Sequence, residues 1–464
     1  MDTCSFLTHA YRSARAELSD RFSTQARWPD RFPGAYLGMG GRDPVFTGAE
    51  HAALIIGPPR SGKTTSIVIP ALTLWPGPAV ATSTKADVLC VTAASRAGRG
   101  KVMVWDPTAK MAMPEGVEPL RWSPLLGCAD WDSAIERAWM LTHAARPDPV
   151  GDALHWTERA GALLAALLHA AALAGQPMSK LLEWIHSRST WDALDQLAIR
   201  PGSAVAHHLL SGINQTDSRE LSGIWSTADS VLAAYRSPAL LYGADHPNFD
   251  PAAFARSTDT VHLVAPGPRA GQYAPAICAL LDQIRSHATD AAVWRDRPPM
   301  LWALDEMANI APLPNMAAIV ADSGSQGLVV LGCLQDLSQA RQRWGTSAEG
   351  LLTLFATTLL LPGIADPATL KTVTTLAGKV DRPQYSIART GLIQRTHTTS
   401  TRPLPLLPEN VIAQGKTGLA LHVRGAYPSW LRLTPHYSTP WIAAALSAAT
   451  TAPAMAPATA PTPS

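Results

Sequence analysis

The sequence predicts an α/β protein whose mostly parallel sheet is interrupted by an all-α region. Apolar stretches at 51–56, 79–83 and 101–105 ("HAALII", "AVATS", "KVMVW") alternate with helical patterns at 63–75 and 85–97. Strand–helix alternation with short links is typical of parallel sheets covered on both faces. From about residue 131 to 250 this alternation stops, and almost every stretch has helical period.

The alternation resumes after the helical region. Strands are expected at 260–266, 300–306, 327–335, 357–362 and 418–423, with helices at about 275–287 and 367–378. The resulting domain organisation is a helical N-terminal segment (1–45), a discontinuous sheet domain (46–130 and 250–445) and an all-α insertion (131–249). The Ala/Pro/Thr-rich tail at 446–464 has no apolar period, so it is expected to be disordered.

Composition limits the possible partners. Only 16% of the 464 residues are charged, against the roughly 25% usual for soluble domains, which favours a surface partly hidden in an assembly. A net charge of +2 argues against one broad basic face for nucleic acid, so any DNA contacts are expected to be few and local. No stretch reads as a membrane span or signal peptide, and the five cysteines form no CxxC pair. The chain therefore reads as cytosolic, with reduced thiols.

A phosphate-binding loop follows the first apolar strand. Residues 57–64, "GPPRSGKT", match G-x-x-x-x-G-K-[ST], with an expected strand before them and an expected helix after them. Backbone N–H groups of such a loop point at phosphate oxygens, and the helix dipole favours the anion. Lys63 is expected to reach the β- and γ-phosphates, and the Thr64 hydroxyl to bind Mg²⁺. The candidate nucleotide-binding residues are Gly57, Pro58, Pro59, Arg60, Ser61, Gly62, Lys63, Thr64 and Thr65.

An acidic pair ends another apolar strand, in "PMLWALDEMANI". Asp305 is expected to orient Mg²⁺, and Glu306 to polarise the attacking water as a general base. Many strands end in acidic residues, so the pair gains its meaning from the phosphate loop. The candidate catalytic residues are Lys63, Glu306 and Gln335. Gln335 ends the next strand and is expected to sense the γ-phosphate; the alternative is a polar residue that only caps the strand. Arg341 and Arg343 are either fingers for a neighbouring nucleotide or a solvated helix face.

Taken in order, these segments resemble type IV secretion coupling proteins, the conjugative DNA-transfer ATPases of the TraG/TraD kind. The resemblance rests on "GPPRSGKTTSIVIPALTLWPG", "VTAASRAGRGKVMVWDP", "RWSPL", "GIWSTADSVLAAY", "LDEMANIAPLP" and "LPLLPENV", and covers about residues 35–435. It implies a RecA-like nucleotide-binding domain interrupted by an all-α domain. It further implies ATP and Mg²⁺ bound between subunits of a hexamer at the inner membrane, with single-stranded DNA, a relaxase or secreted proteins as substrates and the secretion channel as partner.

The sequence departs from this family in three places. It lacks the usual N-terminal membrane helices, so the chain is expected to be either a soluble branch of the family or a cytoplasmic protein held at the inner face of the membrane by a separate partner. The family's D-P-K-G-E segment reads "STKADVL" here, so Lys85 is kept but no metal role follows for Ser83. The stretch "ADSGSQG" lacks the arginine that often contacts a neighbour's ATP, which shifts attention to Arg60, Arg341 or Arg343.

Two alternatives to a single-stranded DNA motor stay open. One is an FtsK-like duplex translocase, although the all-α insertion and the missing basic C-terminal module argue against it. The other is a substrate-receptor adaptor that uses nucleotide as an assembly switch, which the acidic pair argues against. Five tryptophans of the insertion could stack on bases, but a buried core explains them better. These tryptophans are Trp131, Trp139, Trp156, Trp184 and Trp225. Arg219 and Arg236 could contact a substrate, but a solvated surface explains them better.

Overall fold

The computed structural model describes residues 34–447 except 49, 146–151, 296, 391–393 and 425–426. Most of the expected N-terminal helical segment and almost all of the expected disordered tail lie outside these residues. Where the N-terminal segment is described, the expectation of helix is wrong. Two strands, β1 (Tyr36–Gly40) and β2 (Asp43–Phe46), form a hairpin there.

A large sheet organises the molecule. Among the described residues it has the strand order β2-β1-β14-β13-β10-β3-β9-β8-β4-β7-β5-β6. The run from β10 to β6 is parallel, and β13, β14, β1 and β2 extend it by antiparallel pairing. The remaining bounds are β3 Ala53–Ile56, β4 Ala79–Ser83, β5 Val102–Trp105, β6 Val117–Pro119, β7 Thr260–Val264, β8 Met300–Leu304, β9 Leu328–Leu334, β10 Thr357–Leu360, β13 Leu419–Arg424 and β14 Tyr427–Arg432.

The central strands are apolar throughout because both faces of the sheet are covered. In β3, Ala53 and Ile55 belong to one core cluster while Leu54 and Ile56 belong to another. This alternation follows from the two-residue period of a strand. The first cluster includes Ile67 and Leu72 of the helical segment after β3, which runs as a π-helix (Thr64–Val68) into α2 (Ile69–Leu74). The expected parallel α/β sheet, with its strands at 79–83 and 300–304, is therefore present.

Further helices complete the sheet-containing part of the chain. Asp336 caps α16 by accepting N–H bonds from Ser338 and Gln339, and Asp366 caps α18 in the same way. The bounds are α3 Asp87–Ala97, α12 Ala270–Ala288, α13 Ala291–Trp294, α14 Met307–Ile310, α15 Met316–Ser323, α16 Leu337–Trp344, α17 Leu351–Leu354, α18 Pro367–Ala377, α19 Glu409–Gln414 and α20 Pro440–Ser447.

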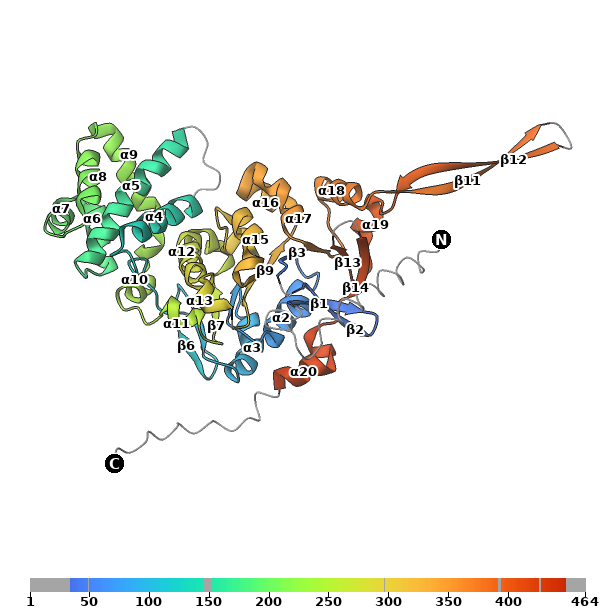
Figure 1. The fold of residues 1–464 in the computed structure, drawn as a ribbon, viewed down its shortest axis with the longest axis horizontal. Coiled ribbons are helices and arrows are strands. Elements are labelled where there is room, and N and C mark those ends of the chain that lie inside the picture. The colour runs from blue at the N-terminus through green and yellow to red at the C-terminus, as the bar shows by residue number, and fades with distance from the viewer. Residues whose placement is uncertain are drawn as a thin grey trace, which may run out of the picture.

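Between β6 and β7 the described residues form helices without a strand. They gather at one end of the molecule (Figure 1), and α4 and α5 pack together there. Trp184 and Trp225 are buried in their core, whereas Trp139 is 38% exposed and stacks on His143. The bounds are α4 Trp131–Ala145, α5 Asp152–Leu173, α6 Met178–Ser187, α7 Trp191–Ala198, α8 Ala204–Asn214, α9 Ser218–Val231, α10 Pro238–Asp245 and α11 Pro251–Ala255.

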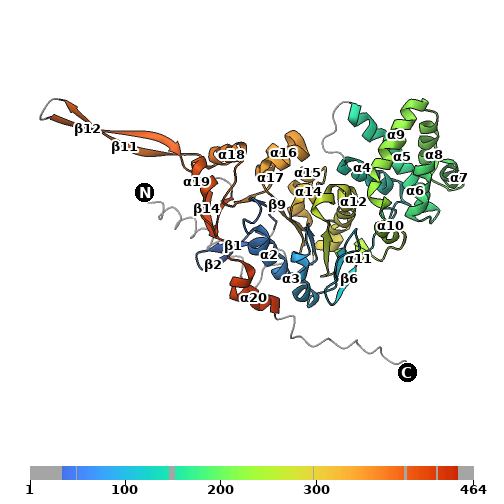
Figure 2. The same cartoon turned by 180° about the vertical axis from the view of Figure 1, so that it is seen from behind.

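A long two-stranded hairpin lies at the other end. Its strands β11 (Lys379–Thr390) and β12 (Gln394–Pro405) pair with each other in a sheet of their own. Figures 1 and 2 show it extending away from the body, with α18 and α19 near its base. The sequence reading missed it because polar residues and prolines fill both strands, which hides any alternation of apolar residues.

Within the described residues, no helix combines the length and the apolarity that crossing a membrane requires.

Candidate functional site

The loop after β3 is held in a tight curl by glycine. A Cβ added to Gly57 would lie 2.7 Å from Cβ of Leu361, closer than packing permits. Gly62 has a φ of 97°, in the region that favours glycine. Arg60 also has a positive φ, of 63°, and its side chain is exposed. The chain thus leaves the sheet, turns back on itself and enters the helix at Thr64.

The loop's polar groups converge on its interior. Lys63 is 8% exposed, and its ammonium donates to the carbonyl oxygens of Gly57 and Pro58, the latter at 3.0 Å. The Ser61 hydroxyl is buried and has no hydrogen-bond partner in the part of the chain described here. A buried hydroxyl without a partner costs free energy, so a bound acceptor would stabilise the loop.

Asp305 meets the loop at the end of β8. The Thr64 hydroxyl donates to its Oδ2 at 2.8 Å, across 241 positions of sequence. The Thr82 hydroxyl, at the end of β4, donates to the Asp305 backbone carbonyl at 2.8 Å. Burial raises the pKa of Asp305, while the Thr64 hydrogen bond and the Lys63 charge oppose that shift. The carboxylate is therefore fixed in position and only partly compensated.

Glu306 follows in an unusual backbone conformation. Its φ of 53° lies in the left-handed region, which is uncommon for a glutamate. The residue directly precedes α14, and its Oε2 accepts a 3.1 Å bond from Asn309. Because the backbone turns sharply here, Asp305 is buried while Glu306 is only half-buried. The two carboxylates therefore have different environments.

The sheet order places Gln335 between these two parts of the site. Its strand, β9, lies between β3 and β8, so all three strands end at the same edge. Gln335 is half-buried, and its backbone N–H donates to Oε1 of Gln339 at 2.9 Å. The structure therefore brings the loop, Asp305, Glu306 and Gln335 to one edge of the sheet.

Two of the three candidate arginine fingers have partners within this chain. Arg341 pairs with Asp366 at 2.7 Å. Burial alone would raise the pKa of the Asp366 carboxyl, but the hydrogen bonds that this carboxyl accepts from Thr369 and Arg341 lower it. Arg343 donates to the carbonyl of Ala144 in α4. Arg60 differs from both because it is an exposed residue of the loop itself.

Sequence reasoning missed two residues beside the site. Asp87, in the first turn of α3, adds to the negative charge that raises the pKa of Asp305, and Ser83 donates to it at 3.4 Å. The signal was present as the carboxylate in "STKADVL". His436 comes from the C-terminal segment, and its Nδ1 lies 3.1 Å from the Thr65 carbonyl. No local pattern indicated that contact.

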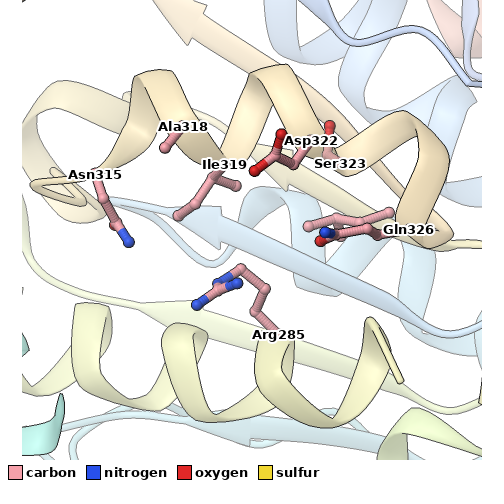
Figure 3. A pocket seen from close by; sticks show the side chains of 8 residues that line it. Arg285, Asn315, Ala318, Ile319, Asp322, Ser323 and Gln326 are labelled. Atoms are coloured by element: carbon pink, nitrogen blue, oxygen red, sulfur yellow. The ribbon is translucent and has the colours of Figure 1, made fainter. Parts of the chain in front are cut away.

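A small pocket lies elsewhere, between α12 and α15. Figure 3 shows Arg285 facing Asn315, Ile319 and Asp322 across it. Leu328, which lines the pocket, begins β9, whereas the candidate site lies where β9 ends. Arg285 is already paired with Asp282 at 2.8 Å. The pocket therefore shares no residue with the candidate site.

The sheet order and this strand-edge loop define a RecA-like P-loop NTPase fold. Comparison with known proteins gives the family. The chain belongs to the type IV secretory system conjugative DNA transfer family, whose family model matches residues 9–446. The expected resemblance is therefore confirmed.

Among curated relatives, the chain is similar to two conjugal transfer proteins TraG from Escherichia coli. One is 24% identical over 330 residues, covering 64% of this chain and 50% of the relative. The other is 23% identical over 329 residues, with the same coverage. The chain thus spans about half the length of the curated relatives it matches.

Solved structures of the plasmid coupling protein TrwB share the fold. An unbound TrwBdeltaN70 structure matches with a TM-score of 0.65 and 17% identity, over 90% of this chain and 91% of that one. TrwB with ADP and Mg²⁺ matches with a TM-score of 0.62 and 18% identity, over 84% and 87%. TrwB with the ATP analogue ADPNP matches with a TM-score of 0.60 and 18% identity, over 83% and 85%.

Proposed function

We propose that this chain is an ATP-hydrolysing coupling protein that drives single-stranded DNA, with its relaxase or with protein substrates, to a type IV secretion channel. The observation that carries the enzymatic part is the 2.8 Å hydrogen bond between Thr64 and Asp305. It joins the phosphate loop to the acidic strand at the edge where Gln335 also lies. Family membership supports the DNA-transfer part.

The loop fits a triphosphate. The unpartnered Ser61 hydroxyl and the curled backbone between Gly57 and Gly62 offer donors to an anion. Lys63, held by two loop carbonyls, is placed to exchange them for phosphate oxygens. TrwB, which shares the fold, has been solved with ADP and Mg²⁺ and with ADPNP. We therefore assign residues 57–65 to nucleotide binding.

The hydroxyl of Thr64 and the carboxylate of Asp305 also fit Mg²⁺, a hard cation that takes oxygen ligands from few carboxylates plus phosphates and water. Bound there, Mg²⁺ would neutralise charge on the phosphates. Glu306 is left free to accept a proton from the attacking water, because its carboxylate is separate from the Thr64–Asp305 contact. Gln335 is assigned to sensing the γ-phosphate.

Assembly and location complete the proposal. A shared-site hexamer would bring an arginine of one subunit to the nucleotide of the next, and Arg60 is the exposed candidate. We assign the helical region 131–249 to substrate handling and residues 46–130 and 250–445 to the nucleotide-binding domain. We place the chain at the inner face of the cell membrane, attached through a partner of the transfer apparatus.

Steady-state hydrolysis tests this proposal. Wild-type protein is expected to hydrolyse ATP faster when single-stranded DNA is added. Glu306→Gln should lower kcat by at least about a hundredfold while the affinity for a fluorescent ATP analogue stays within a few-fold. Lys63→Met should lose both binding and turnover. Nucleotide binding without turnover at any protein concentration would instead support the adaptor.

A further inference from the structure

The hairpin of β11 and β12 carries a local concentration of positive charge. Within residues 379–405 there are five basic residues, Lys379, Arg382, Arg389, Arg395 and Arg402, against one acidic residue, Asp381, for a net charge of +4. The whole chain has a net charge of only +2, so everything outside the hairpin sums to −2. A net charge of +2 is compatible with a few local DNA contacts, and this hairpin is a local basic element of that kind.

The register of the hairpin places like charges opposite one another. Arg382 pairs with Arg402, and Arg389 pairs with Arg395. Directly opposed like charges destabilise an antiparallel pair. A two-stranded hairpin in water is marginal without a packing partner. The opposed arginines therefore suit an anionic partner, which would compensate their charge.

Helix α18 packs against strand β12 at the base of the hairpin (Figure 1). Near the base, residues 379–381 and 401–404 are exposed and Pro405 is half-buried. Each strand has twelve residues. At about 3.3 Å per residue the hairpin reaches roughly 40 Å, which agrees with its extension from the body in Figures 1 and 2.

The prolines disfavour another strand as the partner. Pro383 and Pro403 lack the N–H donors that strand addition along an edge requires. Threonine and serine crowd β12 at 396, 398, 399, 400 and 401, and their hydroxyls suit phosphate oxygens. A two-stranded ribbon is also narrow enough to lie along a nucleic-acid backbone or in a major groove.

We propose that the hairpin of residues 379–405 is a DNA-binding arm that holds the sugar–phosphate backbone through two pairs of arginines. The pairs Arg382–Arg402 and Arg389–Arg395 are seven residues apart along β11, or about 23 Å. Seven is an odd spacing, so by the two-residue period of a strand the two pairs belong to opposite faces of the ribbon, and each face offers DNA one pair of arginines. This proposal rests on the DNA-transfer part of the proposed function but is independent of ATP hydrolysis.

The test is DNA binding by the full chain, measured by fluorescence anisotropy over a series of salt concentrations. Arg382, Arg389, Arg395 and Arg402 are changed together to Gln. Each lost phosphate contact lowers the slope of log K against log salt by about 0.7 for single strands and 0.9 for duplex. The variant's slope should therefore fall by roughly 3 units, with affinity down at least about tenfold. Parallel arms with single-stranded and duplex oligonucleotides show which form of the backbone the arm holds.

Two further variants serve as controls for the effect of the four arginine substitutions. The matched control removes the same charge from exposed sites on the sheet-containing body by changing to Gln the residues Arg42, Lys101, Lys110 and Arg256. Its slope should fall by less than one unit. A second variant replaces 381–403 by Asn-Gly, because Val380 and Leu404 are register partners that a two-residue turn can join. It should behave as the arginine variant does, and both should keep DNA-independent ATP hydrolysis.

The outcomes separate this proposal from the wider function. Wild-type protein that binds DNA, with an unchanged salt slope in both arm variants, overturns the arm alone. Wild-type protein that binds no DNA overturns the arm together with the DNA part of the function. If the arm variants keep the salt slope but lose self-association in light scattering, the hairpin contacts a neighbouring subunit instead of DNA. If wild-type protein binds anionic vesicles more strongly than DNA, and the arm variants lose that binding, the hairpin contacts the membrane instead.

Discussion

The Thr64 hydroxyl connects two segments that are far apart in sequence. It donates to Asp305, and no other atom of the threonine side chain could do so. Replacing Thr64 with Val keeps the shape but removes the hydroxyl. We expect a loss of about 1–2 kcal/mol in nucleotide affinity when Mg²⁺ is present, because both the Mg²⁺ ligand and the donor to Asp305 are gone.

Calorimetric titration with ADP checks this expectation. The loss should largely disappear when EDTA removes Mg²⁺, and Thr64→Ser should bind nearly as wild type does because the hydroxyl is kept. An equal loss with and without Mg²⁺ would mean that the substitution disturbs the loop itself.

The buried histidine of β7 makes the stability of the fold depend on pH. His262 is 1% exposed, its Nε2 has no partner among the described residues, and burial, followed by the charge of Arg96, lowers its pKa to about 3. In the unfolded chain its pKa is about 6.5. Between these values the unfolded state binds a proton that the native state does not, so the free energy of unfolding falls as pH drops below about 6.5.

Replacing His262 with Leu should reduce this acid sensitivity. From about pH 7 to about pH 5.5, one such histidine accounts for about 1 kcal/mol of lost stability. Urea unfolding at the two pH values should show that much less loss in the variant than in wild type. The exposed His208 serves as control, since His208→Leu should leave the difference unchanged. An identical pH dependence in His262→Leu and wild type would contradict the prediction.

At the scale of elements, a hydrogen bond joins α16 of the sheet-containing domain to α4 of the helical region. Arg343 of α16 donates to the Ala144 carbonyl at the end of α4, although 199 positions separate them. Arg343→Met should lower the free energy of unfolding by about 1–2 kcal/mol, because the carbonyl of the buried Ala144 loses a charged donor. The neighbouring variant Arg341→Gln breaks an ion pair whose arginine is 35% exposed, so it should cost less than about 1 kcal/mol.

The same pair of variants tests the role of these arginines. Chemical denaturation measures the stability, and a hydrolysis assay on folded protein measures the activity. If Arg343→Met leaves stability unchanged but abolishes turnover, then Arg343 acts on a nucleotide and the structural role is wrong.

At the scale of the whole molecule, the exposed Arg60 predicts that subunits share a site. Arg60→Ala and Lys63→Met should each be inactive alone, the first for want of a trans arginine and the second for want of a nucleotide. In mixed assemblies, an intact Arg60 on the Lys63→Met subunit can serve the intact loop of its neighbour. Mixing should therefore restore part of the hydrolysis, and light scattering with ATP and single-stranded DNA should show oligomers.

Mixed samples that stay as inactive as the separate variants would place Arg60 in its own subunit's site. A chain that stays monomeric under all these conditions would remove the shared-site mechanism altogether.

The sequence by itself determined the central parallel sheet and predicted the candidate site residues at 57–65, 305, 306 and 335, although it missed Asp87 and His436 beside them. Continuous apolar strands such as 53–56 and 300–304 can be buried only between two layers, so their pattern indicates their environment. The phosphate loop is equally clear in the sequence, because the φ of 97° at Gly62 is a local backbone requirement that favours glycine. Both are short-range requirements that a few neighbouring residues express in full.

Only the tertiary structure decided what depends on distant partners. The strands β1, β2 and β14 exist because the antiparallel edge of the sheet offers them hydrogen bonds, and their own residues give no strong signal. Asp87 and His436 reach the site, and Arg343 is drawn away from it, through contacts across the fold. A residue's type and neighbours fix the local backbone, but its partner is fixed by the packing of the whole chain, which no local pattern encodes.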